Sequence, residues 1–436
     1  MSNSYSVPCI YPKRPVSAAP LSAQVPGSKS ITNRAMLLAT MADGTSLLKG
    51  VLFSDDSRHF LRCIQELGFE TLVDEAEKSI QIKGCGGTIP KREASLYVGS
   101  AGTAARFLTA YLGVSEGVYH MDASEQMRRR PMAPLLTSLA GLGCRVTYDK
   151  EEGCFPFVLK GSGFKRDIIT VNINDSSQFL SALLIASVLS EHRFSIHVEG
   201  SHGMSYIQMT QKMMAQFGVT AAQPEPGLFT IDAGQRYSAG PYQIEPDVSA
   251  ACYFYALAPL LNIPVLVPHI SMDSLQGDIA FLHVLEKMGC TLELSGEGIL
   301  LLPPEAGTYQ GVTVDLSACS DQAITLAAIA PYAQTPTTIS GIGHIRFQEC
   351  DRLTAIVCEL RKMGIICTET ESSITIYPGT PKASEVDTYE DHRMAMGFTL
   401  TGLRTPGIVI KNPECCSKTF ENYFQVMEVA LHGSFA

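Results

Sequence analysis

The sequence predicts an α/β (α+β) fold of two similar domains, each built from three repeats of one unit. Two observations predict it. Six glycines close amphipathic stretches at intervals of about 70 residues, as glycine does just beyond the end of a helix. A chain of 436 residues also exceeds one typical hydrophobic core, so six units divide naturally into two domains of three. The six glycines are Gly68, Gly143, Gly218, Gly289, Gly364 and Gly433.

A helix with polar residues at its start opens each repeat. The six starts read GSKSITNRA from Gly27, SAGTAARFL from Ser100, DSSQFLSALL from Asp175, PDVSAACYF from Pro246, SDQAITLAA from Ser320 and EDHRMAMGF from Glu390. Serine, threonine and aspartate there are usually only helix caps, but these starts carry further charged and amide side chains. Since a helix N-terminus carries about half a positive charge, six of them around one cleft would bind an anion.

The second helix of each repeat has a clean start, and turns rich in glycine and proline separate the segments. In residues 54–68, Ser54 or Asp55 caps a helix whose apolar positions recur at helical spacing. The third repeat ends near Ile231, and the turn-rich segment YSAGPYQIEP follows. We therefore expect a first domain over residues 27–241 and a second over residues 242–436, and we expect residues 1–26 to belong to the second domain.

Composition indicates an ordinary soluble globular protein, with 45% hydrophobic and 17% charged residues. The formal net charge of −10 argues against a nucleic-acid-binding surface. Residues 251–268 are uncharged, but their prolines argue against a membrane helix and favour a buried helix followed by a strand. The 13 cysteines lack zinc-site spacing, and the N-terminus lacks an apolar stretch of signal-peptide length. We expect reduced thiols in a cytoplasmic protein, with no metal, membrane or nucleic-acid partner.

Three segments carry more basic residues than helix capping explains. In VPGSKSITNR, residues 25–34, Lys29 lies at a helix N-terminus, where a bound anion explains a positive charge better than the helix dipole does. This segment is not a P-loop, because its lysine follows Gly27 by two residues. EQMRRRPM, residues 125–132, is either a solvated basic turn or presents one arginine to phosphate or carboxylate. QECDRL, residues 348–353, places an arginine in the first turn of a helix.

Five cations, three from these segments and two from nearer the end of the chain, would surround one small, highly charged anion, and two carboxylates are placed to move protons. They are Lys29, Arg130, Arg352, Arg393 and Lys418, with Glu349 and Asp321. Neither a Ser-His-Asp order, nor a metal-ligand set, nor a dinucleotide-binding glycine fingerprint competes with this interpretation. These residues predict an enzyme that binds phosphorylated, carboxylated small molecules between two domains and uses acid/base chemistry without a metal or cofactor.

Nine motifs follow one another along nearly the whole chain and are specific in combination. They read GSKSITNRA, AGTAARFL, RRRPM, DSSQFLSALL, PDVSAACYF, SLQGDIAFLHVLEKMG, ECDRL, TYEDHRMAM and KTFENYF. In this order they resemble the 5-enolpyruvylshikimate-3-phosphate synthase (EPSP synthase) family. The resemblance implies the enolpyruvyl transferase fold: an inside-out α/β barrel of two domains, each of three βαβαββ-type units, with the active site in the interdomain cleft.

The resemblance also implies a reaction and a place in metabolism. A monomer would transfer the enolpyruvyl (carboxyvinyl) group of phosphoenolpyruvate to the 5-hydroxyl of shikimate 3-phosphate, in the shikimate pathway of aromatic amino acid biosynthesis. Protonation of C3 makes C2 electrophilic, the hydroxyl adds to give a tetrahedral adduct, and phosphate leaves as the C3 proton is lost.

The resemblance assigns roles to individual residues. The phosphoenolpyruvate-binding residues would be Lys29, Gly102, Arg130, Gln178, Arg352, Arg393 and Lys418. The residues that bind shikimate 3-phosphate would be Lys29, Ser30, Arg34, Ser176, Ser177, Gln178, Tyr206, Asp321, His344 and Gln348. Lys29, Asp321 and Glu349 would be catalytic, with Asp321 near the attacking hydroxyl and Glu349 transferring the proton at the enol carbon.

The chain departs from the family pattern mainly where shikimate 3-phosphate would bind. Ser100 stands in place of asparagine, Phe107 of proline, Gly203 of serine, His344 of asparagine and Gln348 of lysine. Two alternative functions remain. The sister enzyme that acts on UDP-N-acetylglucosamine uses a loop cysteine, whereas residues 122–129 contain none. A non-catalytic anion-binding protein would not need proton-transferring carboxylates within a cationic site.

Overall fold

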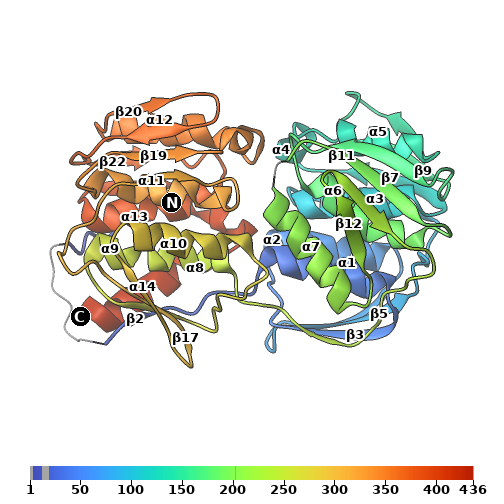
Figure 1. Ribbon diagram of the computed structural model, residues 1–436, viewed down its shortest axis with the longest axis horizontal. Helices are drawn as coiled ribbons and strands as arrows, with labels where there is room; N and C mark the ends of the chain where they lie inside the picture. The colour runs from blue at the N-terminus through green and yellow to red at the C-terminus, as the bar shows by residue number, and fades with distance from the viewer. Residues whose placement is uncertain (1–2, 12–18, 202, 436) are drawn as a thin grey trace. The chain divides into compact units, whose positions relative to one another are not determined.

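The computed structural model describes residues 3–11, 19–201 and 203–435 and divides into two compact units (Figure 1). One unit is Gly27–Glu245, and the other combines Met1–Pro26 with Pro246–Ala436. The chain therefore passes from one unit to the other twice, after Pro26 and after Glu245.

The unit Gly27–Glu245 contains three four-stranded sheets of the same topology. In each sheet the first two strands in the order are parallel, and the remaining pairs are antiparallel. The orders are β14-β3-β5-β4, β6-β7-β9-β8 and β10-β11-β13-β12. The strands are β3 (Asp43–Lys49), β4 (Glu70–Asp74), β5 (Ser79–Cys85), β6 (Glu93–Tyr97), β7 (Gly117–Asp122), β8 (Arg145–Tyr148), β9 (Phe157–Gly161), β10 (Ile168–Asn172), β11 (Phe194–Glu199), β12 (Ala221–Glu225), β13 (Leu228–Ile231) and β14 (Pro241–Gln243). With the helices between them, these strands form βαβαββ units, as the family resemblance implies.

The first helix of each repeat lies in the interior of this unit, and the sheets face outward. These inner helices are α1 (Lys29–Met41), α3 (Gly102–Gly113) and α6 (Gln178–Ala186). Every residue of α3 is buried, and α3 packs against both α1 and α6. In β5 buried and exposed residues alternate, so one side of its sheet covers the core and the other meets water. The remaining helices are α2 (Asp55–Glu66), α4 (Glu125–Arg128), α5 (Ala133–Gly141), the 3₁₀ turn η1 (Ser187–Leu189) and α7 (Met204–Gln216).

The unit of Met1–Pro26 and Pro246–Ala436 repeats this plan and takes two strands from the N-terminal segment. Its sheets have the orders β16-β17-β15-β2, β18-β19-β21-β20 and β1-β23-β22. Strand β2 pairs in parallel with β15, and β1 pairs antiparallel with β23. The strands are β1 (Ser4–Ser6), β2 (Leu21–Ser22), β15 (Val265–Pro268), β16 (Thr291–Leu294), β17 (Gly298–Leu302), β18 (Thr313–Asp315), β19 (Thr337–Ser340), β20 (Cys367–Glu369), β21 (Ile374–Ile376), β22 (Ser384–Val386) and β23 (Ile408–Lys411).

The helices of this unit again begin at the predicted polar segments. Helices α8, η3–α11 and α13 start at or within three residues of Pro246, Ser320 and Glu390. In chain order the helices are α8 (Val248–Tyr255), α9 (Leu257–Leu261), η2 (Gly277–Ala280), α10 (Phe281–Lys287), η3 (Ser320–Gln322), α11 (Ala323–Ile329), η4 (Ala330–Tyr332), η5 (Gly343–Phe347), α12 (Arg352–Lys362), α13 (His392–Arg404), η6 (Pro413–Lys418) and α14 (Tyr423–Phe435).

Five of the six predicted helix-ending glycines are confirmed. Gly68, Gly143, Gly218, Gly289 and Gly364 follow their helices with φ between 79° and 110°, a left-handed conformation that glycine adopts at little cost. The prediction for Gly433 is wrong, because α14 continues through it to Phe435. A glycine inside a helix costs only about 1 kcal/mol, and the helix that contains it buries Tyr423, Met427 and Leu431.

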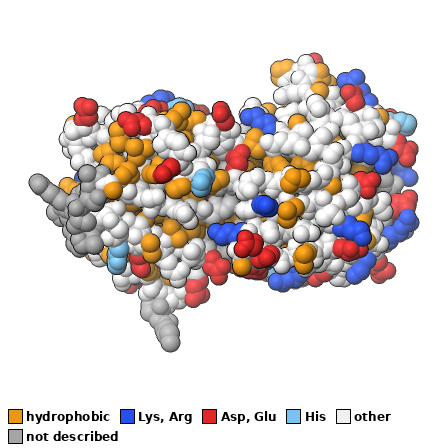
Figure 2. Space-filling view, turned by 90° about the horizontal axis from the view of Figure 1, so that it is seen from below, with side chains coloured by type: hydrophobic (Ala, Val, Ile, Leu, Met, Phe, Trp, Pro, Cys, Tyr) orange, Lys and Arg blue, Asp and Glu red, His pale blue; other side chains and the backbone are white. Residues whose placement is uncertain are grey.

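Residues 251–268 form buried helices followed by a strand, as predicted. Helices α8 and α9 are buried almost throughout, and β15 follows them. None of the helices within the described ranges is long and apolar enough to cross a membrane. On the face drawn in Figure 2, acidic side chains occur in both halves, whereas most of the visible lysine and arginine side chains lie in the right half.

Candidate active site

Arg352 is the centre of an ion-pair network in the unit that contains Pro246–Ala436. It is the first residue of α12, and its side chain is 2% exposed. Its guanidinium meets Asp321 at 2.8 Å, Glu349 at 2.7 Å and Asp391 at 2.7 Å. Burial alone would lower the pKa of Arg352, but the charges of these three carboxylates outweigh burial and raise it above its ordinary value. Arg352 is therefore a permanent cation held between three acids.

Two further cations extend this network, which we call the Arg352 cluster: Asp321, Glu349, Arg352, Asp391, Arg393 and Lys418. Arg393 Nη2 lies 2.7 Å from Asp321 Oδ2, and Lys418 Nζ lies 3.1 Å from Glu349 Oε1. Asp391 caps α13 by accepting a hydrogen bond from the backbone N–H of Arg393 at 2.9 Å. The structure thus brings together three of the five predicted cations and both predicted proton-transfer carboxylates.

Gln348 and His344 lie at the edge of the Arg352 cluster. The side-chain oxygen of Gln348 accepts a hydrogen bond from Arg352 Nη1. His344 Nε2 lies 2.7 Å from the hydroxyl of Ser320, the residue before Asp321. The neighbouring Arg346 turns to other partners, Asp351 at 2.8 Å and Glu369 at 3.2 Å. The departures from the family pattern at positions 344 and 348 therefore lie next to residues of the predicted site.

Three predicted residues, Gly102, Arg130 and Gln178, gather at the N-termini of α3 and α6 in the unit Gly27–Glu245. With Arg106, which was not among the predicted site residues, we call them the Gly102 cluster. Arg106 is buried and donates hydrogen bonds to the Gly102 carbonyl at 3.4 Å and to Gln178 Oε1 at 3.3 Å. A Cβ on Gly102 would lie 2.6 Å from Arg106 Nη1 and 3.0 Å from Arg130 Nη1. Only glycine lets both guanidinium groups approach this helix start.

The three consecutive arginines of RRRPM have different surroundings. Arg128 pairs with Asp122 at 2.9 Å and Arg129 with Glu125 at 3.3 Å, and Arg129 is exposed. Arg130 is half-buried and lies over Gly102. Of the two interpretations that the sequence left open, the solvated turn describes Arg129, whereas Arg130 faces a helix N-terminus.

Lys29 and Arg34 of α1 are both held by the protein. Lys29 Nζ lies 3.3 Å from Asp56 Oδ2, a buried carboxylate in the first turn of α2. The guanidinium of Arg34 donates to Thr210 at 2.8 Å and to the carbonyls of Ser30 at 3.1 Å and Tyr206 at 3.4 Å. Burial lowers the pKa of Arg34 to about 10, an effect that Tyr206 partly opposes. Arg34 thus fixes the backbone of two predicted site residues.

Ser176 and Ser177 lead into α6 beside Gly203. The backbone N–H of Gln178 donates to Ser176 Oγ at 3.3 Å, and Ser177 is buried. Gly203 has φ 65°, and a Cβ there would lie 2.4 Å from Ser177 Oγ. A serine at position 203 would therefore be strained and would displace Ser177, which explains why this chain carries glycine where the family pattern has serine.

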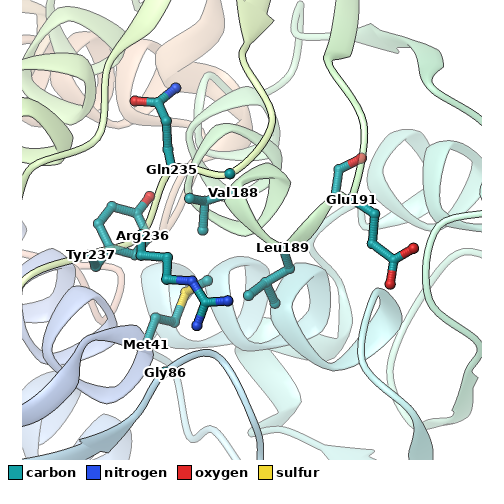
Figure 3. A pocket seen from close by; sticks show the side chains of 10 residues that line it. Met41, Gly86, Val188, Leu189, Glu191, Gln235, Arg236 and Tyr237 are labelled. Atoms are coloured by element: carbon teal, nitrogen blue, oxygen red, sulfur yellow. The ribbon is translucent and has the colours of Figure 1, made fainter.

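A separate cavity of about 360 Å³ in the unit Gly27–Glu245 includes none of the predicted residues. Its lining includes Met41, the last residue of α1, and Val188 and Leu189 of η1 (Figure 3). Lys29 and Met41 are the first and last of the 13 residues of α1, and the helix rises about 1.5 Å per residue between them. The cavity therefore lies about one helix length away from Lys29, and we do not assign the reaction to it.

Three carboxylates of these surroundings were missed as site residues: Asp56, Asp278 and Asp391. Acidic residues at helix starts are ordinary because they complement the helix dipole, so Asp56 and Asp391 gave no distinctive signal. Asp278 lies in the motif LQGD and is buried, where it accepts a hydrogen bond from Gln322. Only tertiary packing reveals that these acids adjoin the predicted cations.

Comparison with known proteins identifies the family of this chain. The family described as EPSP synthase (3-phosphoshikimate 1-carboxyvinyltransferase) matches residues 17–427. The 3-phosphoshikimate 1-carboxyvinyltransferase of Trichormus variabilis is 44% identical over 413 residues, which are 94% of this chain and 96% of the relative. The enzyme of that name from Shewanella baltica is 39% identical over 405 residues, 92% of this chain and 94% of the relative.

Solved structures share the fold along the whole chain. EPSP synthase from Acinetobacter baumannii superposes with a TM-score of 0.78 at 24% identity and covers 98% of this chain and 97% of its own. The enolpyruvyl transferase NikO from Streptomyces tendae gives 0.76 at 14% identity and covers 97% and 96%. These likenesses confirm the predicted enolpyruvyl transferase fold. With the family match and the identity to curated relatives, the chain belongs to the EPSP synthase family and is a 3-phosphoshikimate 1-carboxyvinyltransferase of the shikimate pathway.

Proposed function

We propose that the Arg352 cluster and the Gly102 cluster, with Lys29, carry out the family's reaction: transfer of the enolpyruvyl group of phosphoenolpyruvate to the 5-hydroxyl of shikimate 3-phosphate. The observation that carries this proposal is the direct pairing of cations with carboxylates in the Arg352 cluster. An anionic substrate that binds Arg352, Arg393 or Lys418 must lie against Asp321 or Glu349. A bound anion is therefore placed directly beside the carboxylates that transfer protons.

Phosphoenolpyruvate carries a phosphate and a carboxylate, and the cations of the two clusters, with Lys29, bind these two groups in this proposal. The residues that bind it are Lys29, Gly102, Arg130, Gln178, Arg352, Arg393 and Lys418. Guanidinium groups match both anions with two parallel hydrogen bonds. Fixed cations also stabilise the charge that gathers on phosphate as its bond to C2 breaks, which lowers the barrier of that step.

Glu349 and Asp321 share the proton transfers in this proposal. Glu349 lies between Arg352 and Lys418, and it protonates C3 of phosphoenolpyruvate and later recovers a proton from that carbon. Asp321 lies between Arg352 and Arg393 and accepts the proton of the attacking hydroxyl. The tetrahedral adduct then loses phosphate, so C3 gains and loses one proton, and Asp321 passes the hydroxyl proton to the departing phosphate and is restored as a carboxylate.

We assign to shikimate 3-phosphate the polar groups at the starts of α1, α6 and α7, together with Asp321 and the two residues at the edge of the Arg352 cluster. They are Lys29, Ser30, Arg34, Ser176, Ser177, Gln178, Tyr206, Asp321, His344 and Gln348. Arg34 is 1% exposed and donates to Ser30 and Tyr206, so we assign it the task of holding these two residues in place. We propose further that the enzyme acts as a monomer in the cytoplasm; its 13 free thiols support the reducing compartment.

A phosphate-release assay tests the proposal. Phosphate should leave phosphoenolpyruvate only when shikimate 3-phosphate is present, and a chelator should not reduce the rate. UDP-N-acetylglucosamine in place of shikimate 3-phosphate serves as the control acceptor and should give no release. Equal rates with the two acceptors, or a loss of activity on chelation, would contradict the proposed reaction.

A further inference from the structure

Asp278 is a buried carboxylate that the proposed mechanism does not use. It lies in η2 and is 3% exposed. Its Oδ1 accepts a hydrogen bond from Gln322 Nε2 at 2.7 Å, and the oxygen of the same amide accepts one from Thr325 Oγ1 at 2.9 Å. Gln322 directly follows Asp321 in η3. The hydrogen bond from Gln322 therefore ties the turn that carries Asp321 to a second acid.

The groups that face Asp278 come from four parts of the unit, and most of them are acidic or neutral. They are Asp321 in η3, Cys319 before it, Asp247 at the N-cap of α8, Cys252 within α8, and Arg393 in α13. Asp247 is engaged in capping α8 through the backbone N–H of Ala250 at 2.9 Å. Arg393 directs its Nη2 to Asp321 at 2.7 Å. Arg393 is thus a cation near both Asp278 and Asp321, and it pairs directly with Asp321.

This environment makes the ionised form of Asp278 costly. Burial raises the pKa of Asp278 to about 6, and the charge of Asp321 acts in the same direction, while Arg393 and the hydrogen bond from Gln322 oppose them. The interaction between two carboxylates is mutual, so an ionised Asp278 must also increase the affinity of Asp321 for a proton. The charge on Asp278 changes within the pH range over which turnover can be measured.

We propose that Asp278 is a positioning residue for Asp321: through Gln322 it fixes the turn that carries Asp321, and its negative charge makes Asp321 a stronger proton acceptor. This inference rests on the proposed role of Asp321 as the acceptor of the hydroxyl proton. A general base works better the more tightly it holds the proton it has taken, up to the operating pH. Asp278 would therefore contribute to the rate without touching either substrate.

Asp278→Asn separates the charge from the shape, because asparagine keeps an oxygen that accepts from Gln322. We expect kcat at pH 8 to fall about tenfold, since Asp321 becomes the weaker base. In the unaltered enzyme kcat should decline below about pH 6 as Asp278 takes up a proton, and this inflection should be absent in the variant. An inflection that persists in Asp278→Asn overturns the proposal, whatever the size of the rate loss.

Gln322→Met is a second variant, and it keeps the proposal testable if Asp278→Asn does not fold. Methionine removes the hydrogen bond that favours ionised Asp278, so the inflection should move to higher pH. An unmoved inflection overturns the proposal. Asp273→Asn is the matched control: it makes the same substitution in an exposed residue of the loop before η2, and its pH profile should equal that of the unaltered enzyme.

Failure of this inference can be told apart from failure of the proposed function. If Asp321→Asn retains near-normal turnover, the role of Asp321 is wrong and the inference falls with it. If Asp321→Asn loses activity while Asp278→Asn keeps the inflection near pH 6, the proposed function stands and only the role of Asp278 is wrong.

Discussion

Asp391 organises the Arg352 cluster at the level of single side chains. It is fully buried, accepts a hydrogen bond from Arg352 Nε and caps the helix that begins with His392 and Arg393. One carboxylate thus fixes two cations that come from different helices. A buried charge without such partners costs several kcal/mol, so Asp391 supplies the fixed counter-charge while Asp321 and Glu349 remain at the edge of the cluster, 13% and 9% exposed.

Glu349→Gln tests the proton transfer at C3. The amide keeps the size of the side chain but cannot give and recover a proton, so kcat should fall by about 10²-fold or more, the usual contribution of a positioned acid/base group. Both substrates should still bind in a calorimetric titration. Glu371→Gln, an exposed glutamate of the same unit, is the control and should turn over normally. Near-normal turnover of Glu349→Gln would remove this residue from the mechanism.

Gln348→Lys tests whether the lysine of the family pattern would increase the affinity of this chain for shikimate 3-phosphate. The side chain of Gln348 accepts a hydrogen bond from Arg352, whereas a lysine ammonium would face that guanidinium and be repelled. Arg346 does not compensate, because Asp351 and Glu369 hold it. We expect no gain in affinity for shikimate 3-phosphate from Gln348→Lys, measured by calorimetry.

His344 is the remaining candidate for compensation at position 348. His344→Asn should weaken binding of shikimate 3-phosphate in the present chain and weaken it less in the Gln348→Lys background, a coupling that a double-mutant cycle measures. A tenfold gain from Gln348→Lys alone, or additive effects of the two substitutions, would show that no compensation exists.

At the scale of elements, a strained turn precedes α13. Tyr389 and Glu390 have φ of 54° and 58°, the left-handed region that non-glycine residues rarely occupy. The Tyr389 hydroxyl donates to the buried carboxylate of Glu359 at 2.7 Å, and the same carboxylate pairs with Lys362 at 2.8 Å. The packing of α12 therefore holds the turn that positions Asp391 and Arg393.

Tyr389→Phe should release this turn. Loss of a hydrogen bond to a charged group costs about 1.5–3 kcal/mol, so the midpoint of thermal unfolding should fall. The KM for phosphoenolpyruvate should rise, since Arg393 is no longer held as firmly. Tyr377→Phe is the matched control, because Tyr377 in the same unit is also 40% exposed. Equal midpoints for the two variants would show that Glu359 does not hold the turn through Tyr389.

Local signals explain which elements the sequence predicts and which it does not. Polar caps and left-handed glycines are set by the chain within a turn or two, so the starts of α8 and α13 and the end at Gly364 were predicted. Strands of two or three residues, such as β1 and β2, have no periodicity to detect. Asp56 and Asp278 became recognisable only where tertiary packing brings them against Lys29 and Asp321.

At the scale of the whole molecule, the two units differ in what completes their sheets. All strands of the unit Gly27–Glu245 belong to that one stretch of the chain. Its last strand, β14, pairs with β3 near its beginning and completes the first sheet. The unit with Pro246–Ala436 depends on residues far away in sequence: β2 pairs with β15, β1 pairs with β23, and Val7 packs against Gly402 in α13. Its core therefore includes Val7, Ile10 and Leu21.

This difference predicts opposite behaviour of two fragments. Residues 27–245 expressed alone should fold and unfold in one cooperative thermal transition, since no strand or core residue is missing. Residues 246–436 alone should lack that transition, because the edges of β15 and β23 and the apolar surface under Val7, Ile10 and Leu21 are left uncovered. Addition of a peptide of residues 1–26 should restore the transition, with a midpoint that rises with peptide concentration as binding to the folded state requires. A peptide of scrambled sequence is the control. A cooperative transition of residues 246–436 without any peptide would show that the N-terminal strands are not needed to complete this unit.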